Sequence, residues 1–207
     1  MLLATVVALA LALPVSVPDA DAAEVLAAVA RHHQQVRDLQ ARFEQVYRSA
    51  VLGQEIVESG TVRFKRPGRM RWDYRTPEYK LFVSDGRDLY FYVPADRQVV
   101  VRARAGEQGI ALRLLTGDAD VAREFEARCE TPRRVPTRLT LRPRRPDPDV
   151  AHVTIEVDAA ARVQAIEIHD VQGNLSIFRF REIQENRGLR DAIFHFSVPR
   201  GVEVMRE

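Results

Sequence analysis

The stretch Arg63-Phe64-Lys65-Arg66-Pro67-Gly68-Arg69-Met70-Arg71-Trp72-Asp73-Tyr74, followed by Ser84-Asp85-Gly86, decides the fold of this chain. Its apolar side chains alternate with charged ones at the period of two that a β-strand gives, so one face is apolar and the other ionic. Proline and glycine break the alternation and predict a turn, and Asp85-Gly86 predicts a second turn. The stretch therefore predicts an antiparallel meander whose aromatic face is covered by helices of the same chain or by a ligand.

The first 22 residues have the pattern of an export signal. Residues 2–13 are apolar and uncharged, and the small-residue pattern Ala20-Asp21-Ala22 that follows is favoured by signal peptidases. The apolar run is shorter than the roughly 20 residues that a membrane-spanning helix needs. We therefore expect a signal peptide over residues 1–22, cleaved after Ala22, and one exported domain over residues 23–207; an uncut membrane anchor is the alternative.

Composition narrows the class of protein further. The formal net charge is only +2, so the surface is expected to be mildly basic. Two arginine clusters, Arg133-Arg134 and Arg142, Arg144 and Arg145, could steer an acidic partner or could be solvated surface charge. The single cysteine, Cys129, forms no internal disulfide and is expected to be a small buried residue. Because no cysteine follows the apolar run, the chain offers no acceptor for a lipid anchor at that point.

The rest of the chain continues the strand pattern. Residues 24–37 predict an amphipathic helix, and residues 109–115 predict a short helix that ends at Gly117. Residues 39–47 suit either a strand or a helix. About ten or eleven strands are predicted, over 56–65, 70–74, 79–84, 89–92, 99–104, 125–130, 137–142, 152–157, 163–169, 175–183 and 193–198. This order predicts an antiparallel α+β domain, and not alternating βαβ units.

The sequence offers little for catalysis. It contains no Gly-x-Ser-x-Gly motif, phosphate-binding glycine loop or dinucleotide fingerprint. His32 and His33 diverge by about 100° on a helix and cannot share a metal ion. His152, His169 and His195 lie on different predicted strands, where a cluster in space stays possible. We expect no cofactor and no metal site, and export argues against a nucleic-acid partner.

An apolar pocket is the remaining possibility. The strands carry more large apolar residues than alternation requires, and tryptophan and methionine suit an adaptable apolar surface. An ordinary aromatic core would give the same pattern, and periodicity does not separate the two. The residues concerned are Phe43, Val62, Phe64, Met70, Trp72, Tyr74 and Phe82.

An ordered set of motifs along nearly the whole mature chain resembles the LolA family of periplasmic lipoprotein carriers. The centre of the set is Arg66-Pro67-Gly68-Arg69-x-Arg71-Trp72-x-Tyr74. The other members are Phe43-Glu44-Gln45, Gly60-x-x-x-Phe64, Pro77, Ser84-Asp85-Gly86, Tyr90-x-Tyr92-x-Pro94, Gln98-Val99, Leu114-Leu115-x-Gly117, Asp170-x-x-Gly173 and Phe194-x-Phe196-x-x-Pro199-x-Gly201-Val202.

The resemblance implies an open, incomplete antiparallel β-barrel of about eleven strands, with residues 39–47 as the first strand and helices over the concave face. It implies that Arg66 hydrogen-bonds to a helical lid and holds the empty cavity closed, as the five donors and the charge of an arginine at a helix end allow. By the same likeness Ile110, Leu114 and Leu115 belong to the lid helix. The implied acyl-chain cavity is lined by Phe43, Phe64, Met70, Trp72, Tyr74 and Phe82.

The function implied by the resemblance is the carriage of acylated lipoproteins across the periplasm by a monomer without enzymatic activity. Loading would come from an ATP-driven release complex of the inner membrane, and delivery would go to an outer-membrane lipoprotein receptor. Two alternatives stay open: a lipoprotein-sensing or receptor module of the same fold, and an exported hydrolase that uses the histidines at 152, 169 and 195.

Overall fold

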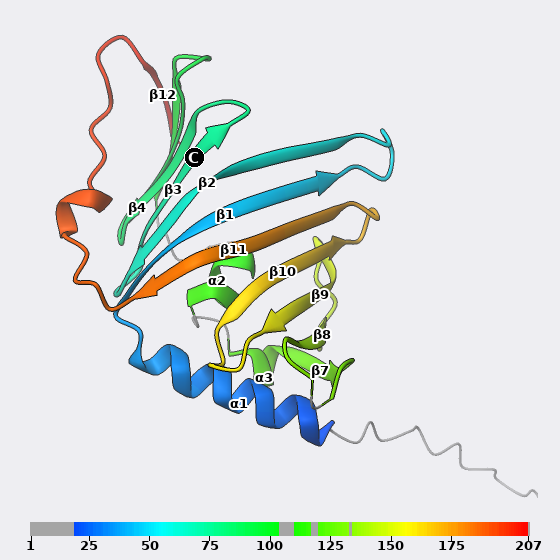
Figure 1. Cartoon of the computed structure of the whole chain (residues 1–207). Helices are drawn as coiled ribbons and strands as arrows, with labels where there is room; N and C mark the ends of the chain where they lie inside the picture. Colours follow the sequence, from blue (N-terminus) through cyan, green and yellow to red (C-terminus); the bar gives the residue numbers. More distant parts are fainter. Residues whose placement is uncertain (1–18, 104–109, 117–119, 133, 207) are drawn as a thin grey trace, which may run out of the picture.

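The computed structural model describes residues 19–103, 110–116, 120–132 and 134–206, and these form one strongly curved sheet with three helices on one side of it (Figure 1). The sheet has twelve strands in the order β12-β6-β5-β4-β3-β2-β1-β11-β10-β9-β8-β7. The strands are β1 (Asp38–Arg48), β2 (Glu55–Lys65), β3 (Arg69–Thr76), β4 (Lys80–Asp85), β5 (Asp88–Val93), β6 (Gln98–Ala103), β7 (Phe125–Cys129), β8 (Thr137–Pro143), β9 (Val150–Val157), β10 (Val163–Asp170), β11 (Leu175–Glu185) and β12 (Glu203–Arg206).

Strand β1 joins the two halves of the sheet, because it pairs with β2 on one side and with β11 on the other. All pairings are antiparallel except that of β12 with β6. Residues 39–47, which suited either a helix or a strand, are therefore part of a central strand, as the resemblance implied. The expected α+β class with an open antiparallel sheet is confirmed.

The helices are α1 (Ala20–Gln35), α2 (Ile110–Thr116) and α3 (Val121–Glu124). Asp19 begins α1, since its carboxylate accepts a hydrogen bond from the backbone N–H of Ala22 at 3.0 Å. Leu26, Val29 and His33 lie on the buried side of α1, so the helix is amphipathic, as expected for residues 24–37. The expected helix end at Gly117 falls outside the described residues. None of the described helices is long and apolar enough to cross a membrane.

One predicted strand is wrong. Residues 193–198 were expected to be extended, but a 3₁₀ turn, η1 (Asp191–Phe194), occupies their start and the following residues join no ladder. Their alternating apolar residues pack onto the sheet without pairing with it: Phe194 is fully buried, and the ring of Phe196 lies between those of Tyr90 and Tyr92. The twelfth strand was missed because β12 has four exposed residues.

The two faces of the sheet are covered differently. Through Phe194 and the neighbouring residues, η1 packs against β3 and β4 on the face opposite the helices. There Asp73 is buried and accepts hydrogen bonds from Arg63 and from both ends of the Arg71 guanidinium. Arg71 also donates to the backbone carbonyl of Ile193 at 3.2 Å, which holds η1 against the sheet.

Gly60 allows a close approach between strands. A Cβ atom at this position would lie 1.9 Å from the backbone oxygen of Asp73 and 3.0 Å from the ring of Phe43. Gly60 pairs with Phe43 across β1 and β2 at the point where the register of β2 and β3 shifts. No larger residue fits this point of the bend, which accounts for the glycine in the Gly60-x-x-x-Phe64 motif.

Candidate functional site

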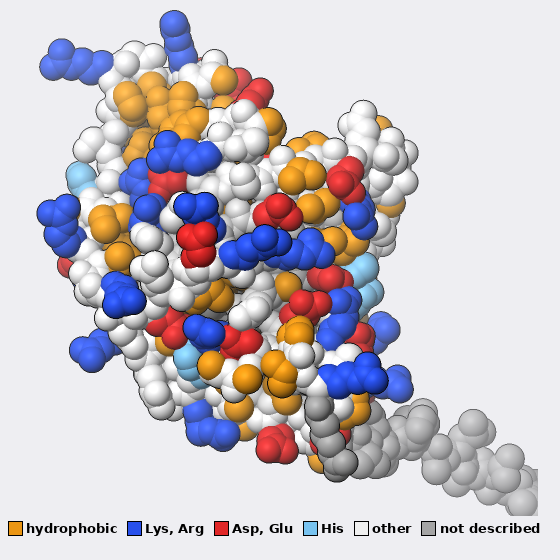
Figure 2. All heavy atoms as spheres, in the orientation of Figure 1, with side chains coloured by type: hydrophobic (Ala, Val, Ile, Leu, Met, Phe, Trp, Pro, Cys, Tyr) orange, Lys and Arg blue, Asp and Glu red, His pale blue; other side chains and the backbone are white. Residues whose placement is uncertain are grey.

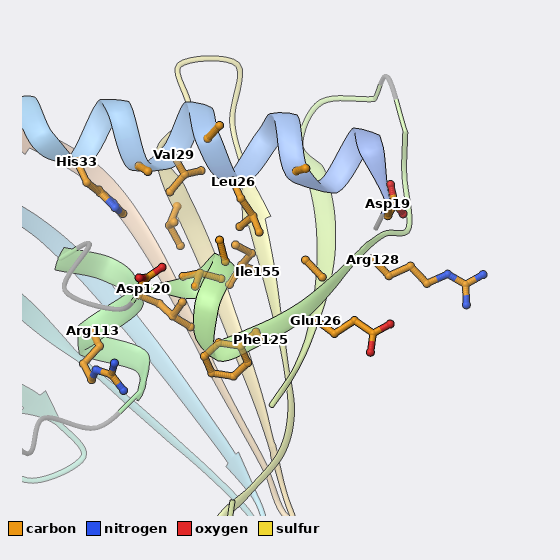
Figure 3. A pocket seen from close by; sticks show the side chains of 18 of the residues that line it. Asp19, Leu26, Val29, His33, Arg113, Asp120, Phe125, Glu126, Arg128 and Ile155 are labelled. Atoms are coloured by element: carbon orange, nitrogen blue, oxygen red, sulfur yellow. The ribbon is translucent and has the colours of Figure 1, made fainter. Parts of the chain in front are cut away.

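A cavity of about 1130 Å³ lies between α1 and the segment formed by α3 and β7 (Figure 3). The apolar part of its wall is built from elements that are far apart in the sequence. Leu26 and Val29 come from α1, Leu114 from α2, Phe125 from β7, Ile155 from β9 and Val163 from β10, and all six are buried. The volume slightly exceeds the range of about 300–1,000 Å³ that is common for small-molecule sites.

Small side chains on α1 keep the cavity open. Ala23, Ala27 and Ala30 line it and are exposed to solvent, and they follow one another at helical spacings of four and three residues. A larger side chain at any of these positions would project into the space. The cavity therefore reaches solvent along the flank of α1.

Charged residues surround the apolar wall. Arg113 of α2 and Glu124 of α3 form an ion pair at 2.5 Å, which ties the two short helices together. Asp120 accepts from the backbone N–H of Arg123 and begins α3. In Figure 3 the side chains of Glu126 and Arg128 point away from the cavity, while Phe125 and Ile155 face it. The wall is thus apolar at depth and polar at its margin.

Arg66 lies where the end of β2 meets the C-terminus of α1, and it also lines the cavity. Its guanidinium donates to the backbone carbonyls of Val36, at 3.1 Å, and of His33, at 3.4 Å. Its backbone N–H donates to the carbonyl of Arg37. The helix end that these bonds reach belongs to α1, and a positive charge there is favoured by the helix dipole.

Comparison with known proteins decides the family. Residues 34–197 match the family "Outer membrane lipoprotein carrier protein LolA". The chain is 33% identical to the outer-membrane lipoprotein carrier protein of Cupriavidus taiwanensis over 150 residues, which cover 72% of this chain and 71% of that protein. It is 31% identical to the carrier of Alkalilimnicola ehrlichii, with 98% and 93% covered. The chain belongs to the LolA family.

A similar fold is known from a solved structure. A solved structure of an uncharacterized conserved protein from Thermus thermophilus superposes with a TM-score of 0.58, covering 90% of this chain and 99% of that one at 16% identity. LolA-family proteins are periplasmic lipoprotein carriers and not enzymes. The chain is therefore a lipoprotein carrier of the LolA family, and the hydrolase alternative is dismissed.

The three histidines that the hydrolase alternative would need, His152, His169 and His195, do not lie together. The rings of His152 and His169 stack at 4.1 Å between β9 and β10. His195 follows η1, which packs against β3 and β4. Among the described residues there is no group of three His, Cys, Asp or Glu side chains placed to hold a metal ion.

The six residues expected to line the LolA acyl-chain cavity are absent from the wall of the large cavity. The ring of Phe43 lies 4.8 Å from those of both Trp72 and Tyr74, and Trp72 also contacts Phe178 and Phe180. We call these five residues the aromatic cluster. Met70 and Phe64 are buried beside it as partners across β2 and β3.

Phe82 differs from the other five. It is half-buried, its ring stacks on Phe91 at 4.2 Å, and it lines a second hollow of about 260 Å³ with Leu89, Phe91, Val100 and Arg102. This hollow lies on the same sheet face as Trp72, which pairs with Phe82 across β3 and β4. The concave face thus carries a large hollow beneath α1 and a smaller one on β4 to β6.

The expected lid residues lie on α2. Leu114 and Leu115 are buried in the same apolar core as the aromatic cluster, and Ile110 packs against that core. Of these three, only Leu114 lines the large cavity. The short helix therefore contacts both the cavity and the core of the LolA fold.

Charges on the surface are mixed. Figure 2 shows lysine and arginine interleaved with aspartate and glutamate over the visible face, without a large area of one sign. Arg142, Arg144 and Arg145 are exposed, as expected for solvated charge, and Arg144 also lines the cavity. This face therefore gives no indication of a basic surface that would bind an acidic partner.

Sequence reasoning missed most of the cavity wall. Val121, Phe125 and Ala127 come from a short helix and an edge strand that carry no strong pattern. One signal was available, because Ala23, Ala27 and Ala30 repeat at helical spacing beside the apolar stripe of α1. A row of alanines next to a buried stripe indicates a helix that leaves space beside it.

Proposed function

We propose that this chain holds the acyl chains of lipoproteins in the cavity beneath α1 and carries them from an ATP-driven release complex of the inner membrane to a receptor at the outer membrane. The observation that carries the proposal is the cavity of about 1130 Å³ with a buried apolar wall in a LolA-family chain. The charged margin keeps the outside of the site compatible with water.

The energetics explain why a carrier needs such a site. Each buried methylene is worth about 0.8 kcal/mol, so a long acyl chain costs on the order of 10 kcal/mol when it is exposed to water. Transfer through the aqueous periplasm is negligible without shelter. A cavity that already exists in the protein lowers the free energy of this intermediate, because no packed core has to open completely before binding.

Arg66 and α2 are proposed to hold the empty cavity partly closed. Arg66 joins the end of β2 to the C-terminus of α1, and Arg113 joins α2 to α3. These polar contacts fix the helices over the sheet without filling the space between them. In the loaded protein we expect the helices to move outward, so that the acyl chains also reach the aromatic cluster and Phe82.

A substitution on α1 that fills the cavity tests the proposal. Ala27→Trp places an indole in the space, and Arg31→Trp is the matched control, since Arg31 is exposed on the same helix and does not line the cavity. A synthetic triacylated cysteinyl peptide should displace the fluorescent apolar probe anilinonaphthalene sulfonate from the wild type and from Arg31→Trp. Its affinity for Ala27→Trp should fall at least tenfold. Equal affinities for the two variants would place the acyl chains elsewhere.

A further inference from the structure

Strand β7 ends the sheet, so one of its edges faces no other strand among the described residues. The backbone N–H of Glu130 donates to the carbonyl of Arg138, and the N–H of Arg144 donates to the carbonyl of Glu124. The even-numbered residues of β7 are therefore the ones whose backbone groups bond to β8. In an antiparallel ladder the positions alternate. The N–H and C=O groups of Phe125, Ala127 and Cys129 therefore point away from the sheet.

Both ends of this edge are already occupied. The N–H of Phe125 donates to the carbonyl of Val121 at the end of α3. The N–H of Cys129 donates to the carboxylate of Asp19 at 2.8 Å. Between them, the N–H of Ala127 has no partner in the part of the chain that the structure describes. Along the described edge the Ala127 N–H is thus the open donor, and the Ala127 C=O is an open acceptor beside it.

The open position lies at the cavity. Ala127 and Phe125 both line it, Phe125 with its ring against the apolar wall. The neighbouring Arg128 points away toward solvent in Figure 3. A ligand group at Ala127 would therefore have hydrocarbon surroundings on one side and water on the other.

We infer that the open edge of β7 at Ala127 binds the amide group that joins an acyl chain to the N-terminal residue of the cargo. This inference rests on the proposed function. The amide is the point at which hydrocarbon ends and polypeptide begins, and it carries a carbonyl that accepts from the Ala127 N–H. The next peptide N–H of the cargo donates to the Ala127 carbonyl, which makes a single β-bridge.

The charge and size of the site fit this ligand. An acyl-linked amide is neutral, and the open N–H and C=O are neutral too, so no charged group has to be desolvated at the edge. In the full chain the occupied N–H groups of Phe125 and Cys129 leave the Ala127 N–H as the donor for the cargo. Cleavage after Ala22 would remove Asp19 and free the Cys129 N–H as well. The site would thus recognise the acylated junction and stay indifferent to the cargo sequence beyond it.

Amide hydrogen exchange of the isotopically labelled protein, purified from the periplasm, tests the inference. In the free protein the Ala127 amide should exchange at least tenfold faster than the Arg128 amide, which lies at a position that bonds to β8. The triacylated cysteinyl peptide should slow exchange at Ala127 at least tenfold. Dodecyltrimethylammonium, which has an alkyl chain but no carbonyl, should leave it unchanged.

A variant pair gives a second measurement. Ala127→Pro removes the N–H at a position outside the ladder, and Ala127→Val keeps the N–H with a side chain of similar bulk. We expect Ala127→Pro to bind the triacylated peptide at least fivefold more weakly than Ala127→Val does, with equal affinity for dodecyltrimethylammonium. If Ala127→Pro does not fold, the exchange measurement on the wild type still decides.

The outcomes separate this inference from the proposed function. If the peptide displaces the apolar probe but exchange at Ala127 does not change, the edge site is wrong and the cavity function stands. If the peptide does not displace the probe at all, the acyl-binding function is wrong and the edge site is wrong with it. Equal slowing by dodecyltrimethylammonium would show general closure of the cavity and would also overturn the edge site.

Discussion

The Nε of Arg66 donates to the backbone carbonyl of Val36 at 3.1 Å, and this bond joins the turn after β2 to the end of α1. A second nitrogen of the same guanidinium reaches His33 in the last turn of the helix. The two contacts cross about thirty positions of sequence and hold the cavity-lining helix against the sheet. We expect them to set the balance between the empty and the loaded protein.

Replacement of Arg66 tests this balance. Arg66→Leu removes both contacts from carbonyls at a helix end, so we expect a loss of about 1–2 kcal/mol in the free energy of unfolding. If the contacts stabilise mainly the empty form, the variant also retains cargo longer. Arg69→Leu is the control, because Arg69 lies 3.6 Å from Asp191 in a partly exposed pair and does not line the cavity. Unchanged cargo transfer by Arg66→Leu would count against its role in closure.

A second prediction concerns the ionic face of the sheet. Asp73 is buried and pairs with Arg63 at 2.8 Å and Arg71 at 2.9 Å. Asp73→Ala leaves both guanidiniums without their carboxylate, so we expect a loss of about 3–5 kcal/mol in stability by urea unfolding. Asp96→Ala, at an exposed position, should change stability by less than about 0.5 kcal/mol. Similar small losses for both variants would mean that the buried cluster contributes little.

Protonation of His152 should lower the stability of the fold when the pH falls below neutral. Burial lowers the pKa of His152 below its ordinary value of 6.5, and the neighbouring His169 and Arg142 lower it further, against the opposing charges of Glu130 and Glu167. The unfolded chain then binds a proton more readily than the folded one, so stability is full above about pH 6.5 and declines as the pH falls through the lowered pKa. His152→Gln should reduce the drop in Tm between pH 7.5 and 5.0. An identical drop in wild type and variant would exclude His152 as its source.

The single tryptophan reports whether acyl chains reach the aromatic cluster. Trp72 is 7% exposed, so its fluorescence in the empty protein should resist a water-soluble quencher such as iodide. A triacylated peptide with brominated acyl chains should quench it, and the unbrominated peptide should not. Displacement of the apolar probe without quenching would confine the chains to the cavity beneath α1 and leave the aromatic cluster as ordinary core.

The mass of the exported protein tests the leader. We expect it to begin at Ala23, as the small-residue pattern Ala20-Asp21-Ala22 predicts, a position inside the first turn of α1. Cleavage there removes Asp19, whose carboxylate accepts from Ala22 and Cys129 and whose pKa is lowered chiefly by the bond from Cys129. A mass that includes Asp19 would show cleavage further upstream and a retained helix cap.

The sequence predicted most of the sheet for a clear physical reason. Period-two alternation and turn residues are local signals, and the motif from Arg63 to Tyr74 forms β2, a turn and β3 as expected. The pairing of β1 with β11 was not predictable in this way, since it joins strands more than 120 positions apart. The segment around Phe194 was misread because apolar alternation also suits a chain that packs across a sheet without pairing.

The cavity was harder to predict than the fold. The prediction favoured the large aromatic residues near Trp72, yet in the structure these rings pack against one another. The space itself lies where side chains are small, beside Ala23, Ala27 and Ala30, and where α3 and β7 approach α1. A cavity forms where elements that are distant in the sequence pack incompletely against one another. Local sequence patterns indicate the large residues that fill space, but they do not show where small residues leave space open.

Carriage of acylated cargo is tested most directly by what the protein holds in the periplasm. Tagged wild type, Ala27→Trp and Arg31→Trp are purified from the periplasm without detergent, and the bound proteins and their acyl groups are identified by mass spectrometry. We predict acylated lipoproteins with the wild type and Arg31→Trp, and at least a tenfold loss with Ala27→Trp. The absence of acylated protein from the wild type, or equal amounts with both tryptophan variants, would contradict the account.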